Sequence, residues 1–82
     1  MHITVTLFAL MRERAGIDTI LLEVPAGAAI TQALATLVSQ YPTLEPYIAN
    51  TRFSLHMDFV DPNTILAEGD ELVLIPPVSG GA

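Results

Sequence analysis

The feature that most constrains the fold is the apolar run Leu72-Val73-Leu74-Ile75 close to the end of the chain. It shows no alternation of polar and apolar residues, which is typical of a strand buried on both faces. Such a strand lies in the centre of a sheet. Pro76 and Pro77 follow and end the strand. We therefore expect the last strand to be central and to lie beside a strand formed much earlier in the chain.

The preceding segments predict strands and helices by their hydrophobic periods. Residues 2–8 alternate, with Ile3, Val5 and Leu7 on one face, and residues 9–15 have helical composition before Gly16. The other expected elements are a strand at 19–24, a helix at 29–40, an irregular or short 3₁₀ segment at 43–49, a strand at 51–57, a short strand at 59–60 and the last strand at 71–75. The helix carries an apolar stripe formed by Ile30, Ala33, Leu34, Leu37, Val38 and Tyr41.

This order predicts an α+β fold in which a mixed sheet packs on one main helix, the β-grasp or ubiquitin-like arrangement. A chain of 82 residues forms one small domain. We expect this β-grasp domain to span residues 1–75. Residues 76–82 should form a flexible, extended C-terminal tail, because two prolines favour a stiff projection and the following glycines have no side chains.

Composition excludes several classes of function. Nine acidic residues face three arginines and no lysine, for a net charge of −6, which argues against binding to nucleic acid. There is no cysteine, so we expect neither a disulfide nor a thiolate metal site, and a reducing cytoplasm is the expected location. Neither a signal peptide nor an apolar run long enough for a membrane span is evident, so no membrane partner is expected.

The body of the chain offers no convincing catalytic group. His56 lies near Asp58 and Asp61, but the spacing matches no metal-ligand motif, so no metal is expected. Asp70 and Glu71 are adjacent carboxylates, but the sequence around them is typical of a turn. His2 and Ser54 are interpreted as bystanders, and Ser79 in a tail cannot be held against a base.

The tail carries the remaining chemistry. Gly80 and Gly81 are thin enough to enter a narrow cleft of a partner, and a terminal carboxylate can be activated by adenylation and then attacked by sulfur or an amine. The alternative is a frayed terminus. Ala82 follows the second glycine, so it would have to be removed before Gly81 could be activated.

Two segments resemble the small subunit of molybdopterin synthase, the MoaD family. These are the opening ITVTLFA at 3–9 with RERAG at 12–16, and the ending EGDELVLIPPVSGG at 68–81. The resemblance implies a β-grasp sulfur carrier of molybdenum cofactor biosynthesis. It implies that Gly81 is adenylated by an E1-like, MoeB-type enzyme that uses ATP, and becomes a thiocarboxylate. The tail residues Pro76, Pro77, Val78, Ser79 and Gly80 would then insert into a MoaE-type large subunit, where sulfur passes to cyclic pyranopterin monophosphate. The carrier itself would bind no cofactor and have no independent active site.

Three alternatives remain open at this point. A ThiS-type carrier of thiamine synthesis also ends in Gly-Gly, a ubiquitin-like modifier would conjugate to lysines, and a non-conjugating binding domain would keep Ala82. A chain that is 51% hydrophobic has more apolar side chains than one small core should hide. We therefore expect a partner interface that includes Phe8, Leu74 and Ile75.

Overall fold

The computed structural model describes residues 1–76 of the chain. Its elements are β1 (His2–Leu7), α1 (Ala9–Ala15), β2 (Thr19–Glu23), α2 (Ile30–Gln40), the 3₁₀ helix η1 (Pro42–Leu44), α3 (Glu45–Ile48), β3 (Arg52–Leu55), β4 (Asp58–Val60) and β5 (Glu71–Ile75). The predicted tail residues from Pro77 to Ala82 lie outside the described residues.

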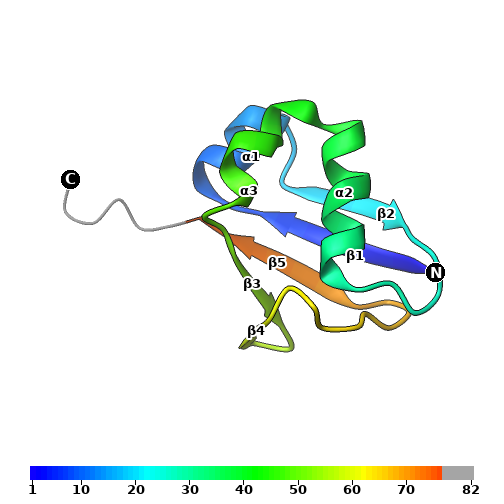
Figure 1. Ribbon diagram of the computed structural model, residues 1–82. Coiled ribbons are helices and arrows are strands. Elements are labelled where there is room, and N and C mark those ends of the chain that lie inside the picture. Colours follow the sequence, from blue (N-terminus) through cyan, green and yellow to red (C-terminus); the bar gives the residue numbers. More distant parts are fainter. Residues whose placement is uncertain (77–82) are drawn as a thin grey trace.

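The five strands form one mixed sheet in the order β2-β1-β5-β3-β4. The last strand is central, as predicted, and runs parallel to β1, with Thr4 opposite Glu71 and Leu7 opposite Leu74. β2 and β3 pair antiparallel with β1 and β5 on either side. Figure 1 shows α2 lying across one face of this sheet. The fold is the predicted ubiquitin-like β-grasp.

The prediction that β5 is buried on both faces is wrong. Leu72 and Leu74 are fully buried, whereas Val73 and Ile75 are half-buried. A central position in the sheet covers the edges of a strand but not its faces. The helices pack on the face that carries Leu72 and Leu74, and the face that carries Val73 and Ile75 is left open.

The helix α2 is held by its apolar stripe rather than by strong capping. Ile30, Ala33, Leu34 and Leu37 are buried, as predicted, while Val38 and Tyr41 are half-buried. Ala29 has no side chain that could cap the helix, so the Gln32 side chain reaches back and accepts the Ala29 N–H at 2.9 Å. The helix ends before Pro42 with a hydrogen bond from the Tyr41 N–H to the Leu37 carbonyl.

Replacing Leu37 with alanine should lower the free energy of unfolding by about 2–5 kcal/mol, because Leu37 is fully buried against the sheet and the change leaves a cavity. Chemical denaturation measures this loss. The matched control is Leu21→Ala at a leucine that is 71% exposed, which should change the stability by about 0.5 kcal/mol or less. Equal losses in the two variants would contradict the helix register.

Two short segments differ in how well they were predicted. α1 ends as expected, because Gly16 adopts a left-handed conformation with φ of 77° and donates its N–H to the Arg12 carbonyl at 2.9 Å.

The segment 43–49 is more regular than predicted. There η1 and α3 follow one another and bury Leu44 completely. Tyr47 and Ile48 also pack against the core, so tertiary contacts accompany a segment that lacks a clear periodic pattern.

The strand predicted at 51–57 is too long, because the chain turns at His56 and Met57. Leu55 pairs with Asp58 across a two-residue hairpin loop. His56 and Met57 have φ values of 52° and 69°, the left-handed region that such tight hairpin turns require. Neither residue favours this conformation as glycine or asparagine would, so the sequence carried no turn signal here.

Replacing His56 with asparagine and Met57 with glycine should raise the free energy of unfolding by about 0.5–1 kcal/mol, since Asn-Gly suits this turn. Thermal and chemical denaturation of the double variant measure the gain. Met57→Val is the opposing control, because a β-branched side chain is disfavoured at positive φ and should lower the stability. A stabilised Met57→Val chain would show that the turn is formed differently.

Candidate functional site

The candidate site begins where the central strand ends. Ile75 lies opposite Arg52 at the start of β3, and Leu74 lies opposite Leu7 at the end of β1. Phe8 follows Leu7 directly, so the exit of β5 is flanked by the end of β1 and the beginning of β3. Pro76 is half-buried at this position. We call this group, made of Phe8, Arg52, Ile75 and Pro76, the tail root.

The predicted interface residues have different positions in the fold. Phe8 is 47% exposed and Ile75 is half-buried, so both offer apolar surface at the tail root, and their role stays a prediction. Leu74 is different, because it has no exposed surface and contributes to the core under the helices. Its inclusion in the interface was wrong, since neighbouring residues of a strand point to opposite faces.

The register of the strands defines the open face of the sheet. One row crosses from Thr6 to Val73, Ser54 and Phe59, which lie opposite one another on β1, β5, β3 and β4. Leu21 lies opposite Thr4 on the same face and is 71% exposed, and Phe59 is 63% exposed. The open face therefore combines small polar residues with exposed apolar ones, and it is continuous with the tail root.

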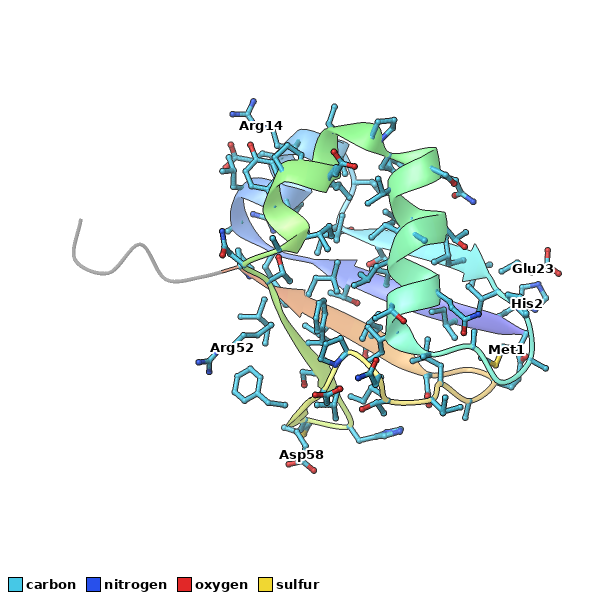
Figure 2. All side chains as sticks on the ribbon, in the orientation of Figure 1. Met1, His2, Arg14, Glu23, Arg52 and Asp58 are labelled. Atoms are coloured by element: carbon cyan, nitrogen blue, oxygen red, sulfur yellow. The ribbon has the colours of Figure 1, made fainter. Side chains whose placement is uncertain are left out.

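Sequence reasoning missed Val73, Arg52 and Phe59 as surface residues. Arg52 places its guanidinium 5.5 Å from the centre of the Phe59 ring. The pairing of β3 with β4 brings Arg52 close to Phe59. The register of this pairing depends on the turn at His56 and Met57, which the sequence did not predict. Figure 2 shows Arg14 and Arg52 at the end of the molecule where β5 ends, and His2 and Glu23 at the opposite end.

The candidate polar groups in the body have structural partners. Asp70 is buried, and its Oδ2 accepts the Ala67 N–H at 2.8 Å, while His56 Nε2 lies 3.4 Å from its Oδ1. Glu71 is instead exposed on the open face and accepts the Thr6 hydroxyl at 2.7 Å. The adjacent carboxylates therefore point to different sides of the sheet and do not form a pair.

Other polar residues add no site within residues 1–76. His2 lies within 4.0 Å of Glu23 and Glu68, and its backbone N–H donates to Glu68 Oε1 at 2.9 Å. In this part of the chain no three His, Asp or Glu side chains gather as a metal-binding group. The helices described there are all too short or too polar to cross a membrane.

The mixed five-stranded sheet packed on one main helix (Figure 1) defines a ubiquitin-like β-grasp protein. The model of the ThiS family matches residues 5–81, which is nearly the whole chain. The chain belongs to this family, which the MoaD-type carriers share.

Similar proteins agree with this assignment. The molybdopterin synthase sulfur carrier subunit of Chlamydomonas reinhardtii is 36% identical over 83 residues, covering 99% of this chain and 100% of that protein. The crystal structure of SAMP1 from Haloferax volcanii matches with a TM-score of 0.91 and 31% identity, covering 99% of this chain and all of that one. A complex of subunits 1 and 2 of the molybdopterin-converting factor from Helicobacter pylori contains the same fold, with a TM-score of 0.71, 23% identity and coverage of 99% and 100%.

Proposed function

We propose that this chain is the sulfur-carrier subunit of a molybdopterin synthase. The proposal is supported above all by full-length similarity to a protein of that name, at 36% identity and without large insertions. It is supported also by the position of Gly80 and Gly81, which follow the central strand of a rigid domain after a short segment. Residues 1–75 would serve as the docking domain and residues 76–82 as the delivered tail.

The chemistry is that of a carboxylate at Gly81. Attack of the carboxylate oxygen on the α-phosphate of ATP gives an acyl-adenylate and releases pyrophosphate. A sulfur nucleophile then displaces AMP and leaves a thiocarboxylate, whose sulfur passes to cyclic pyranopterin monophosphate. ATP is bound by the activating enzyme, a MoeB-type partner, and the carrier holds no cofactor in this proposal. The carrier supplies the acyl group and the docking surfaces, and its partners supply the catalytic residues.

The surface that would receive the large subunit is the open face together with the tail root. Apolar residues at the tail root would be covered as the tail enters the partner's cleft. The Helicobacter pylori complex is named as one of two subunits of a molybdopterin-converting factor, and by analogy we propose a MoaE-type large subunit as the partner here. Phe8 and Ile75 are then the central apolar contacts, since aromatic residues at the centre of an interface contribute most to affinity.

Replacing Phe8 with alanine should weaken association with the large subunit by about tenfold or more, because a half-exposed aromatic side chain loses its contact area. Isothermal titration with the cognate large subunit measures the change. Ile65→Ala is the control, since Ile65 is 61% exposed but lies outside the open face and the tail root. Equal affinity of the Phe8 variant and the parent chain would exclude Phe8 from the interface.

The direct test of the proposed function is intact-mass measurement after incubation with an E1-like enzyme, ATP and a sulfur source. The measurement uses a chain ending at Gly81, because removal of Ala82 requires a peptidase that this mixture lacks. For that chain we expect the mass change of exchanging one oxygen for sulfur. Addition of the large subunit and cyclic pyranopterin monophosphate should then return the carrier to its carboxylate form. A chain that is never adenylated, or that stays unchanged, would contradict the proposal.

A second candidate function has a specific observation in its favour, namely the close match to SAMP1, which is named a small archaeal modifier protein. In a modifier, the activated Gly81 would form an isopeptide bond with a lysine of another protein. The same assay separates the two functions when a lysine-rich acceptor protein is added. Formation of covalent adducts instead of a thiocarboxylate would favour the modifier.

A further inference from the structure

Ala9, the first residue of α1, has a backbone conformation that no hairpin turn explains. Its φ is 52°, in the left-handed region. The other non-glycine residues with positive φ in the described part of the chain are His56 and Met57, which form the tight turn between β3 and β4. Glycine reaches this region without a steric cost, whereas the Cβ of alanine is crowded there. Ala9 is therefore a strained residue outside a hairpin, directly after Phe8 of the tail root.

The chain is anchored on both sides of Ala9. On one side, Leu7 is buried at the end of β1. On the other side, Met11 has no exposed surface, and the Arg14 carbonyl accepts the Thr43 hydroxyl at 3.2 Å. These contacts determine where β1 ends and where α1 lies, so residue 9 takes the conformation that joins the two. A strained backbone persists where the surrounding structure determines it in this way.

The start of α1 has no capping interaction that would offset the strain. Phe8 occupies the N-cap position without a side-chain hydrogen bond, and the Arg12 N–H donates to the Phe8 carbonyl at the long distance of 3.4 Å. Burial of Met11 in the core therefore holds this end of the helix in place of a cap. Since the strain at Ala9 is offset by tertiary contacts, a substitution there should be felt by its neighbour Phe8.

Phe8 continues β1 by one residue. Its backbone is extended, with φ of −128° and ψ of 160°, so the alternation of side chains along the strand continues through it. Leu7 lies opposite Leu74, which places Phe8 beside Ile75 on the open face of the sheet. Phe8 is 47% exposed and Ile75 is half-buried, as this position requires.

The conformation of Ala9 determines that β1 stops there. An extended residue at position 9 would carry the strand on beside Pro76, which has no N–H to pair with it. The left-handed residue instead turns the chain out of the strand and into α1. Figure 1 shows this passage from β1 to α1 at the end of the sheet where β5 also ends. The orientation of Phe8 therefore depends on the backbone of the residue that follows it.

From the strain, the two anchors and the extended backbone of Phe8, we infer that Ala9 is a positioning residue for the proposed docking surface. Its left-handed backbone ends β1 directly after Phe8 and holds the Phe8 ring beside Ile75 at the tail root. The use of this ring by the large subunit rests on the proposed function, whereas the position of the ring in the free chain does not. Ala9 acts through Phe8 and contacts no partner itself.

The first test is nuclear magnetic resonance of the full free chain labelled with ¹⁵N and ¹³C. We expect a strong Overhauser contact between the N–H and Hα of residue 9, which indicates positive φ, and contacts between the Phe8 ring and the Ile75 methyl groups. Ala9→Asn and Ala9→Gly should keep both, because asparagine and glycine tolerate the left-handed region. Ala9→Val should lose the Phe8–Ile75 contacts, because a β-branched side chain is disfavoured at positive φ.

The matched control is Leu10→Val, which places valine one residue later, at a side chain that is 41% exposed. It should keep the Phe8–Ile75 contacts. A folded Ala9→Val chain that keeps these contacts would overturn the inference. If the Ala9→Val chain does not fold, the Ala9→Gly chain decides: positive φ with the contacts retained supports the inference, and negative φ with the contacts retained overturns it.

Thermal denaturation measures the strain at Ala9. Ala9→Gly should raise the melting temperature by about 2–5 °C, because glycine adopts the same backbone without crowding. Ala9→Val should lower it. A lower melting temperature for the Ala9→Gly chain than for the parent chain would show that Ala9 is not strained, which overturns the inference.

Binding to the cognate large subunit tests whether Ala9 acts through Phe8. Ala9→Val should weaken association by about three- to tenfold in the parent chain, with no further loss in a chain that already carries Phe8→Ala. Equal losses in the two backgrounds would show that Ala9 acts independently of Phe8 and would overturn the inference. If no chain binds the large subunit, the proposed function fails, and the contacts in the free chain still decide the inference.

Discussion

Replacing Gly80 with valine should reduce sulfur transfer by about 100-fold or more, because a β-branched side chain would hold the tail away from its reactive position in a narrow cleft. The free energy of unfolding should stay within about 0.5 kcal/mol of the parent chain. The buried core residues of the described part all lie at or before Leu74, so the domain does not depend on Gly80 for its packing. Single-turnover transfer to cyclic pyranopterin monophosphate and chemical denaturation measure the two quantities.

Two control variants test whether the loss of sulfur transfer depends on the size and the position of the added side chain. Gly80→Ala adds a single methyl group and should give an intermediate rate. Ser79→Val places the same bulky side chain one residue earlier, where no glycine is present, and should cost less than Gly80→Val. A Gly80→Val chain that transfers sulfur at the parent rate would show that the tail does not enter a narrow cleft.

A chain ending at Gly81 should form the thiocarboxylate at once, whereas a chain ending at Ala82 should be inert until Ala82 is removed. The acyl group that is activated must be the terminal one, because only a free carboxylate can attack ATP. An additional alanine also adds a side chain where two glycines leave the tail thin. The two proteins, made side by side and incubated with the E1-like enzyme, ATP and a sulfur source, are compared by intact mass over time.

The control is a third chain in which Ala82 is replaced by proline, which most exopeptidases remove poorly. When a carboxypeptidase is added to the mixture, the proline chain should remain inactive while the Ala82 chain becomes active. If the protein that still ends in Ala82 is adenylated as fast as the shorter one, with no earlier loss of mass, Gly81 is not the acceptor. The proposed carrier function would then lack its reactive residue.

Most of the fold could be predicted because the periodic patterns were strong. Ile3, Val5 and Leu7 alternate in β1 and are buried, and the stripe through Leu34 and Leu37 defines the buried side of α2. The failures have physical causes. The turn at His56-Met57 uses residues that do not favour a left-handed conformation. The segment of η1 and α3 makes tertiary contacts through Leu44, Tyr47 and Ile48, which no local pattern shows.

The candidate site was predictable only in part. The Gly80-Gly81 pair and the resemblance of the ending to the MoaD family are visible in the sequence itself. Leu74 was wrongly assigned to the surface because an apolar run does not show which face of the strand each residue occupies. The cluster of Arg52 with Phe59 depends on the register between β3 and β4. No sequence pattern encodes that register when the turn residues give no signal.

The parallel pairing of β1 with β5 has a consequence for how the protein is made. Thr4 of β1 can pair with Glu71 of β5 only after nearly the whole chain has been synthesised. Until then, the β1–β2 pair and the β3–β4 hairpin have no strand to join them. Contacts between such distant residues slow folding relative to chains whose contacts are mostly local. Because Gly81 is encoded after β5, every chain that is synthesised as far as Gly81 also contains the strand that joins the two strand pairs. A chain interrupted earlier exposes unpaired strand edges and lacks the C-terminal Gly81 that an activating enzyme would use.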